Sequence, residues 1–357
     1  MPFATVLVSV VCVSYNDIHH LKHLFASLER QSFQDFEVIV VDNAQSHEVH
    51  DYVSSLGKSK HLYSYVPNEN EGYPGGNVRG VQYANGDLIL IINADTILDE
   101  DALSYLVKDF STRSRDVVVL VPKIMIRTSD VINSIGMVKI RRSENLYTNI
   151  GYLAHDHGQF DISQKVEAFD GSAFMLRKEL LDQTYLFDPR YFFGNETVDL
   201  AERMTKLGLS AYTCPKAVVR HEIRGTVTSS KQNNLIAAII VRNSLIHTMR
   251  NQSSSMFLRT LIIGIICRNI LGRLITRYNT RVGLIYLRGL AMFVLQLGIF
   301  VKSPYSDQFS DSRKRSRPGR IASEYPAVRA DGHCNTPDNF YSHFTLPTTK
   351  HSVRVQT

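Results

Sequence analysis

The sequence contains no acidic residue between Arg242 and Lys302, a stretch that carries nine Lys and Arg residues. The formal net charge of the whole chain is +6, so the rest of the chain is slightly acidic. A nucleic-acid-binding protein would instead spread positive charge over a general basic face. We therefore expect no nucleic-acid partner.

Cysteine is also scarce, and the four cysteines lie far apart without the spacing of a metal site: Cys12, Cys214, Cys267 and Cys334. Cys12 falls inside an apolar run, where a thiol behaves as a small hydrophobic side chain. This pattern fits a reducing, cytosolic setting. The first sixteen residues lack a charged leader and a processing site, and they are interpreted as the first strand, not as a signal peptide.

Three apolar runs, at 6–13, 36–41 and 88–92, each end in polar residues. Continuous runs of this kind are typical of strands buried on both faces of a parallel sheet. Between the first two, Leu21, Leu24, Phe25 and Leu28 have helical spacing. The alternation predicts an α/β fold with a mostly parallel central sheet flanked by helices.

The central stretch of the chain is Gly86 to Asp101, GDLILIINADTILDED. Ligands of open α/β sheets bind at the carboxyl ends of strands, where Asn93 and Asp95 follow the third apolar run. One interpretation is that Asp95 holds a divalent cation that bridges a diphosphate. The other is that Asn93 and Asp95 only cap and turn the chain. A helix is expected to start just beyond, with the acids of residues 99–101 in its first turn.

The segment 67–77, PNENEGYPGGN, is predicted to be an irregular loop because it is rich in Gly, Pro and Asn. Gly75 and Gly76 would let backbone N–H groups approach a phosphate or a sugar closely. The segment lacks the G-x-G-x-x-G spacing of a nicotinamide site, and a plain connector is the alternative. A helix is expected from Val78 to Ala84.

Six motifs occur in order between residues 6 and 250: SVVCVSYN, VIVVDN, NENEGYPGGNVRG, ANGDLILIINADT, DGSAFMLRKELL and FDPRYFFGNETVDLAERMTKLG. Together they resemble the inverting family 2 glycosyltransferases, and most of all their rhamnosyltransferase-like branch. The resemblance implies a GT-A fold and a nucleotide-diphospho-sugar donor bound through Mg or Mn.

The resemblance also assigns a nucleotide-sugar site. Asp42 should accept a hydrogen bond from the nucleobase, in a pocket lined by Tyr15 and Asn16. Asp95 matches the last position of the D-x-D motif, whereas Asn93 replaces the first carboxylate and removes one charge from the cation site. The full set is Tyr15, Asn16, Asp42, Gly75, Gly76, Asn77, Asn93 and Asp95.

His221 resembles a histidine that completes the metal site of the family. It follows a strand-like segment, 217–219. A lone histidine is also often structural, and both interpretations stay open. The expected metal ligands are therefore Asp95 and His221.

The remaining motifs concern the acceptor. In similar enzymes the turn Asp170, Gly171 and Ser172 lies beside the acceptor. An inverting transfer needs a base that takes the proton of the acceptor hydroxyl. Glu196, at the start of a predicted helix over 196–207, is the preferred base, although Thr197 departs from the acidic pattern of the family. Asp199, one turn on, is the reserve, and Glu196 as a simple helix-end charge is the alternative.

Three segments are expected: a catalytic domain over 1–250, basic apolar helices over 251–302, and a polar, mostly disordered tail over 303–357. The apolar stretches 256–267 and 284–301 are interrupted by polar residues and are short for a membrane span. They are interpreted as interfacial helices on an anionic membrane surface, with a small soluble helical domain as the alternative. This predicts a peripheral or monotopic protein at the cytoplasmic face of the cell membrane.

The prediction as a whole is an inverting, metal-dependent glycosyltransferase. It would move a sugar from a donor such as dTDP-rhamnose or a UDP-sugar to a lipid-linked or glycan acceptor. One alternative is a non-catalytic nucleotide-sugar-binding protein, because Asn93 and Thr197 each replace a carboxylate. A nucleotidyltransferase would need a glycine-rich phosphate loop after the first strand, which residues 14–17 do not provide.

Overall fold

The structure is a computed structural model that describes residues 8–56, 59, 61–141, 146–222, 230–251, 254–255, 257–258 and 287–295. The predicted tail over 303–357 and most of the predicted basic helices over 251–302 lie outside these residues. Among the described helices, none combines the length and the apolar character needed to cross a membrane.

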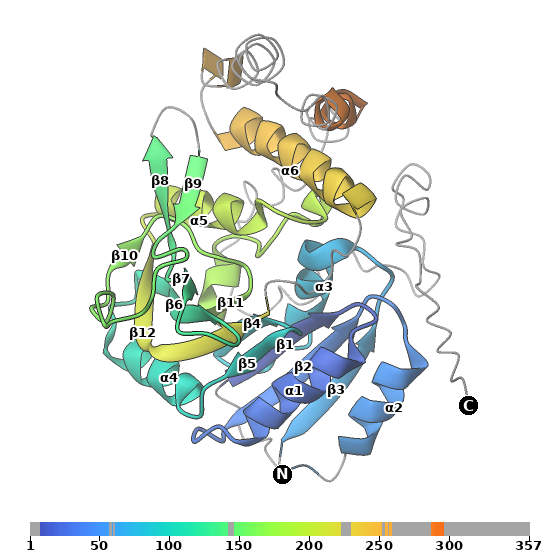
Figure 1. Ribbon diagram of the computed structural model, residues 1–357, viewed down its shortest axis with the longest axis vertical. Helices are drawn as coiled ribbons and strands as arrows, with labels where there is room; N and C mark the ends of the chain where they lie inside the picture. Colours follow the sequence, from blue (N-terminus) through green and yellow to red (C-terminus); the bar gives the residue numbers. More distant parts are fainter. Residues whose placement is uncertain are drawn as a thin grey trace.

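A mixed central sheet runs in the order β10-β12-β6-β11-β4-β1-β2-β3 (Figure 1). Its strands are β1 (Val8–Ser14), β2 (Phe36–Asp42), β3 (Leu62–Pro67), β4 (Leu88–Asn93), β6 (Val117–Ile126), β10 (Lys165–Val166), β11 (Ala173–Arg177) and β12 (Ser210–His221). Strand β1 pairs in parallel with β2 and β4, β2 with β3, and β6 with β12. Strand β11 runs antiparallel between β4 and β6. The predicted α/β fold is confirmed.

Two short strands extend the central sheet, and two others form a separate hairpin. Strand β5 (Thr96–Leu98) pairs with β12, and β7 (Ile132–Ser134) pairs with β6. Strands β8 (Met137–Arg141) and β9 (Leu146–Asn149) form a separate hairpin. β5 was missed from the sequence because three residues are too few to show a period.

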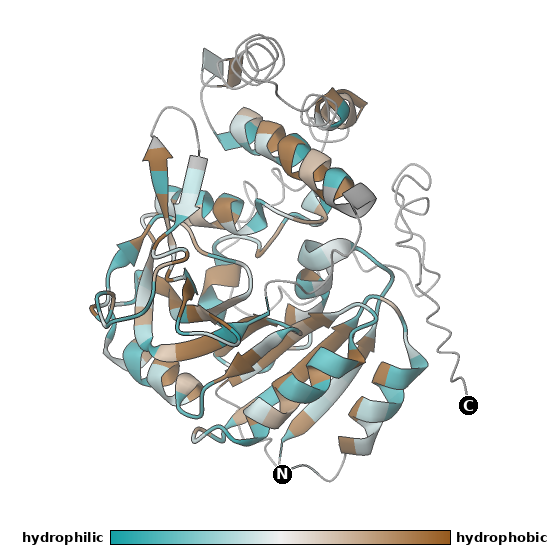
Figure 2. Ribbon diagram, in the orientation of Figure 1, coloured by the Kyte–Doolittle hydropathy of each residue, from teal (hydrophilic) through white to brown (hydrophobic). Residues whose placement is uncertain are grey.

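Helices cover both faces of the sheet. Helices α1 (Ile18–Glu29), α2 (His47–Ser55) and α4 (Ala102–Thr112) pack on one apolar cluster, and α3 (Gly72–Val81) and α5 (Glu196–Lys206) pack on the other. Successive residues of β1 alternate between the two, with Val10 and Cys12 in the first cluster and Val11 in the second. This alternation explains the unbroken apolar runs, and Figure 2 shows the apolar strands between more polar helices.

Helix α6 (Ser230–Asn251) lies beside α5 (Figure 1). Two short 3₁₀ segments, η2 (Lys178–Asp182) and η3 (Pro189–Tyr191), precede α5 in the chain. The side chains of α6 form polar contacts with α5 and with the loop between η3 and α5, and these contacts are described below.

Two sequence predictions of local structure were wrong. Residues 72–77 are not an irregular loop but the first part of α3. The glycines make this possible through close packing: a Cβ on Gly76 would lie 2.8 Å from Cγ1 of Val13, and one on Gly80 would lie 2.4 Å from Cγ1 of Val11. Tertiary packing therefore outweighs the low helix propensity of glycine. Helix α4 begins at Ala102 instead of Asp99, because β5 runs to Leu98 and residues 99–101 form the turn between the two elements, with Asp101 as the N-cap.

Candidate active site

The polar ends of several strands meet at one edge of the sheet. Ser14 of β1 pairs with Asp42 of β2, and Val13 of β1 pairs with Asn93 of β4. Strand β11 is antiparallel to β4 and begins at this edge, and the N–H of Asn93 donates to the carbonyl of Ser172 at 2.9 Å. The predicted donor residues and the predicted acceptor turn therefore share one edge, which we call the rim.

Several buried polar atoms of this region lack a hydrogen-bond partner. Within the described residues they include Oγ of Ser14, Oδ1 of Asn77, Oγ of Ser172, Oε2 of Glu196 and Nδ1 of His221. Buried polar groups are normally paired, so unpaired ones call for an explanation. Their residues belong to the strand ends of the rim and to the elements beside it, as expected of a site that receives a polar ligand.

Asp95 and His221 are brought together, as the sequence predicted for a pair of metal ligands. Nε2 of His221 lies 3.2 Å from Oδ1 of Asp95, and both side chains are largely buried. The contact follows from the pairing of β5 with β12, which sets His221 opposite Thr96. Burial lowers the pKa of His221, but Asp95 outweighs this effect and the pKa is raised.

The chemistry of this pair fits a divalent cation. A carboxylate suits Mg and Mn, and an imidazole favours Mn over Mg. No cluster of three or more His, Cys, Asp or Glu side chains forms a metal site among the described residues. A cation held by Asp95 and His221 would therefore need further oxygen ligands, which a diphosphate can supply.

Asp42 is fully buried, and both of its carboxylate oxygens are engaged. Oδ1 accepts from the N–H of Ala44 at 3.1 Å, and Oδ2 accepts from the N–H of Ser46 at 2.7 Å and from the hydroxyl of Tyr65 at 3.2 Å. These bonds fix the turn that leads into α2. A carboxylate has about four lone-pair positions, so one stays available for a nucleobase.

The other residues predicted to bind the nucleotide occupy two different environments. Tyr15 is half-buried and Asn16 is exposed at the mouth of the rim, where Asn16 adopts a left-handed backbone conformation with φ of 53°. Gly75 and Gly76 are instead buried in α3: Gly76 packs on Val13, and Gly75 packs on the side chain of Glu71. The two glycines thus serve helix packing in this structure.

Asn77 of α3 is fully buried. Its Nδ2 donates to the carbonyl of Tyr73 at 2.9 Å, and its Oδ1 is one of the unpaired atoms. Tyr73 lies on the same helix and was missed from the sequence. Its hydroxyl donates to the carbonyl of Gly171, and this hydrogen bond links α3 to the predicted acceptor turn.

The acceptor turn itself is compact. Oδ1 of Asp170 accepts from the N–H of Ser172 at 2.8 Å, which closes the turn before β11. Gly171 presents no side chain at its centre, and a Cβ built there would lie 3.5 Å from Oε1 of Glu196. The predicted acceptor turn and the preferred base are therefore direct neighbours.

Glu196 is the first residue of α5 and is 7% exposed. Burial raises its pKa from 4.5 to about 7, against the opposing effect of the backbone N–H groups of Glu196 and Gly194. Oε2 has no hydrogen-bond partner among the residues that the structure describes. A buried carboxyl with a free oxygen and a pKa near neutrality has the properties of a general base.

Asp199, the reserve base, has a different environment. Its Oδ2 accepts from Nε of Arg203 at 2.9 Å, and its Oδ1 accepts from Nδ2 of Asn251 at 2.9 Å and from the hydroxyl of Tyr191 at 3.2 Å. Burial would raise its pKa, but Arg203, His247 and Arg250 hold the pKa well below its usual range. Such a carboxylate is a weak proton acceptor and joins α5 to α6.

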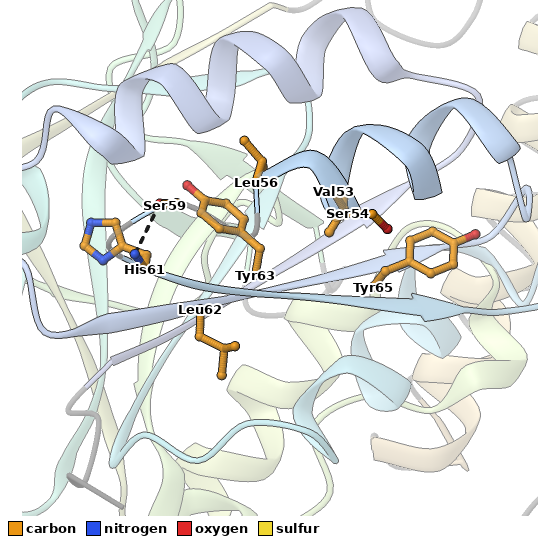
Figure 3. Close-up of a pocket in the computed structure, with 8 residues that line it drawn as sticks. All are labelled: Val53, Ser54, Leu56, Ser59, His61, Leu62, Tyr63 and Tyr65. Carbon is orange, nitrogen blue, oxygen red and sulfur yellow. Dashed lines mark hydrogen bonds between the residues drawn. The ribbon is translucent and has the colours of Figure 1, made fainter.

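A separate hollow of about 410 Å³ lies between α2 and the edge strand β3 (Figure 3). It is lined by Val53, Ser54, Leu56, Ser59, His61, Leu62, Tyr63 and Tyr65. Its volume would suit a small ligand, but the hydroxyls of Ser59 and Tyr63 already donate to Glu29. None of the residues predicted to bind donor or acceptor lines this hollow.

The chain resembles known proteins both in sequence and in fold. Residues 9–184 match the model of glycosyl transferase family 2. Over 102 residues the chain is 29% identical to the GalNAc(5)-diNAcBac-PP-undecaprenol beta-1,3-glucosyltransferase of Campylobacter jejuni, which covers 28% of this chain and 33% of that protein. The chain spans 25% to 38% of the length of curated relatives it matches.

Two solved structures share the fold. GalNAc-T7 with UDP, GalNAc and Mn²⁺ aligns with 69% of this chain and 48% of its own, at a TM-score of 0.56 and 17% identity. The mannosyltransferase PcManGT from Pyrobaculum calidifontis, in complex with GDP-Man and Mn²⁺, aligns with 87% of this chain and 84% of its own, at a TM-score of 0.51 and 14% identity. Residues 9–184 therefore resemble a family 2 glycosyltransferase domain, and the described sheet and helices share the GT-A fold of these two structures.

Proposed function

We propose that this protein is an inverting glycosyltransferase in which Glu196 is the general base. One observation carries the proposal: the Glu196 carboxyl is buried beside the turn at Gly171, has a pKa of about 7, and has one oxygen without a partner in the described part of the chain. The other candidate base on this helix, Asp199, is engaged by Arg203 and Asn251. The choice between the two acids therefore rests on their contacts.

In the proposed reaction Glu196 takes the proton from an acceptor hydroxyl as its oxygen attacks the anomeric carbon of the donor sugar. A bond forms between the acceptor oxygen and the anomeric carbon, and the bond from that carbon to the diphosphate breaks. The leaving group departs as a nucleoside diphosphate. A single displacement of this kind inverts the anomeric centre, and the turn at 170–172 orients the acceptor beside the base.

We propose that Asp95 and His221 hold a divalent cation, Mn or Mg. When bound, such a cation offsets the negative charge that develops on the departing diphosphate. The pair lies at the carboxyl edge of the sheet, where diphosphates bind in this class of fold. Two solved proteins of the same fold contain Mn²⁺, which supports this assignment.

The donor proposed is a nucleotide-diphospho-sugar such as dTDP-rhamnose or a UDP-sugar. Its nucleobase would lie among Tyr15, Asn16 and Asp42, and its diphosphate nearer Asn77 and Asn93. Support comes from the neighbours of this fold, one of which holds UDP and the other GDP-Man. A melting-temperature panel of dTDP-rhamnose, UDP-glucose and GDP-mannose with Mn would identify the donor, because a ligand stabilises the state it binds. We call the sugar nucleotide that gives the largest shift the selected donor.

The acceptor proposed is lipid-linked or an oligosaccharide. The Campylobacter jejuni relative is named for a polyprenyl-linked substrate, which supports this class. Arg242 is buried and Arg250 is paired with Asp188, but the other seven cations of the acid-free stretch that ends at Lys302 would favour an anionic membrane surface, at about 1 kcal/mol for each residue near the leaflet. We therefore place the protein at the cytoplasmic face of the cell membrane as a peripheral or monotopic enzyme.

Sedimentation of the full chain with lipid vesicles tests this placement. The protein should pellet with vesicles of anionic lipid better than with neutral ones, and high salt should release only part of it. Protein that stays in the supernatant with anionic vesicles at low salt would instead fit a soluble helical domain in this segment.

Substitution of the base tests the reaction. Glu196→Gln should lower the release of nucleoside diphosphate from the selected donor by roughly 10² to 10⁴-fold, while donor binding is retained. Asp199→Asn is the matched comparison on the same helix. If Asp199→Asn abolishes turnover in folded protein and Glu196→Gln does not, the base is Asp199.

A non-catalytic nucleotide-sugar-binding protein of the same fold is the competing function. It is distinguished by donor hydrolysis: wild-type protein that binds the selected donor tightly with Mn but never releases nucleoside diphosphate is a binding protein. The unpaired oxygen of the buried Glu196 carboxyl favours the enzyme, because buried ionisable groups with a shifted pKa are concentrated at catalytic sites.

A further inference from the structure

The loop that precedes Glu196 has an unusual backbone. Phe192, Gly194 and Asn195 have φ angles of 61°, 84° and 71°, and Asn195 is the residue directly before α5. Residues other than glycine adopt such angles at a cost, and they persist only where the surroundings hold them. The position of the Glu196 carboxylate therefore depends on whatever holds this loop.

Helix α6 supplies most of the contacts that hold it. Nδ2 of Asn243 lies 2.9 Å from the carbonyl oxygen of Tyr191, 2.8 Å from that of Phe193 and 2.7 Å from that of Gly194. Asn243 is fully buried. An amide nitrogen carries two hydrogens, so the three carbonyls share them. One side chain thereby links three backbone positions of the loop.

The orientation of the Asn243 amide is set by its neighbour in the sequence. Oδ1 of Asn243 accepts from Nη2 of Arg242 at 2.6 Å and from Nε at 2.9 Å. The reverse orientation would set an amide oxygen against three carbonyls and an amide nitrogen against a guanidinium, so the contacts allow only one assignment. Arg242, also fully buried, donates to the carbonyl of Tyr191 at 2.8 Å as well.

Two further contacts complete the arrangement. Nδ2 of Asn195 donates to Oγ of Ser244 in α6 at 3.2 Å. From the other side, the N–H of Tyr73 in α3 donates to the carbonyl of Phe192 at 3.0 Å. The loop is thus held between α6 and α3. The last of its contacts with α6 is made by Asn195, the residue directly before Glu196.

We propose that Asn243 is a positioning residue that sets the place of the Glu196 carboxylate through the carbonyls of residues 191, 193 and 194. It touches neither donor nor acceptor and acts through the loop. This inference rests on the proposed function of Glu196. It extends the active site to α6, which lies outside the family match at 9–184.

Asn243→Ala tests the inference, with Thr248→Ala as the matched control. Thr248 is equally buried in α6, but its hydroxyl donates within the helix to the carbonyl of Ser244 and does not contact the loop. For Asn243→Ala we expect kcat with the selected donor to fall by about 10 to 100-fold while donor Kd and KM stay within about twofold, since small displacements of a reacting group are costly. Thr248→Ala should leave kcat unchanged.

A second measurement does not depend on activity. In protein labelled with ¹³C at glutamate carboxyls, Glu196→Gln identifies the Glu196 resonance, and its titration midpoint should move in Asn243→Ala but not in Thr248→Ala. If Asn243→Ala does not fold, Asn243→Ser keeps one donor and should show the same changes in smaller measure. A purely structural role would lower the melting temperature and leave the midpoint and kcat unchanged, which would overturn the inference.

The two proposals fail in different ways. If Glu196→Gln retains full turnover, the base assignment is wrong whatever Asn243 does. If Glu196→Gln loses turnover while Asn243→Ala keeps the wild-type kcat and titration midpoint, only the positioning role is wrong.

Discussion

Nε2 of His221 lies 3.2 Å from Oδ1 of Asp95, although the two residues are far apart in the sequence. The contact arises because β5 leaves the rim just after Asp95 and pairs with the end of β12. Both side chains are 13% to 16% exposed, so they meet where a ligand can reach them without a large rearrangement.

The first prediction concerns this pair. Asp95→Asn keeps the size of the side chain but removes its charge, so it should weaken nucleoside diphosphate binding only when Mn is present. Titration calorimetry with UDP and dTDP, with and without Mn, measures the effect. Equal affinity of both proteins in the presence of Mn would contradict the role of Asp95.

The second prediction concerns pH. Only the ionised form of Glu196 accepts a proton, and its pKa is about 7, so kcat/KM should rise with pH below about 7 and level off above it. A pH–rate profile of the wild-type protein with the selected donor measures this limb. A rate that is independent of pH between about 5.5 and 8 would argue against Glu196 as the base.

The third prediction separates the two candidate bases of α5 by their effect on stability. Asp199→Asn breaks the buried pair with Arg203 and should lower the free energy of unfolding by about 3–5 kcal/mol. Glu196→Gln removes a carboxyl that has an unpaired oxygen, and it should change the free energy of unfolding little. Urea denaturation of both variants at pH 7 compares them, and the reverse order would mean that the contacts of the two acids are misassigned.

The pH dependence of the Asp199 contribution has a definite sign. The pKa of Asp199 is lower in the folded protein than in the unfolded chain, so its stabilising contribution is fully present above the unfolded value of about 3.9. The contribution is lost as pH falls below that value. The stability difference between wild type and Asp199→Asn should therefore narrow in acid, and a difference that grows there would contradict the assignment.

The fourth prediction uses Gly171. A Cβ at this position would lie 3.4 Å from the hydroxyl oxygen of Tyr73 and 3.5 Å from Oε1 of Glu196, which are ordinary contact distances. Gly171→Ala should therefore fold with a nearly unchanged melting temperature. The added methyl group would lie against the Glu196 carboxyl and make its surroundings less polar, so the rising part of the pH–rate profile should move to higher pH. An unchanged limb would mean that Gly171 does not border the working face of the base.

The sequence by itself determined the order of the main elements and much of the site. Apolar runs specify β1, β2 and β4 because strands buried on both faces need apolar residues at every position. Parallel pairing then brings the polar ends of these strands to one edge, so the meeting of Asp42 and Asn93 at the rim follows from the pattern. The family resemblance added Asp95, His221 and Glu196 as candidates.

Only the tertiary structure decided the rest. Gly72, Gly75 and Gly76 predict a loop from the sequence, but the close contact of α3 with Val11 and Val13 makes residues 72–77 the first part of a helix. Glu196 and Asp199 are equivalent in sequence as acids one turn apart. Arg203, four residues after Asp199, is a local partner that the sequence itself places on the same helix face. The other partner, Asn251 of α6, lies 52 residues along the chain, and no local pattern predicts its contact. The role of Asn243 depends on the same packing, because its three partners are carbonyls, which every residue carries and no sequence distinguishes.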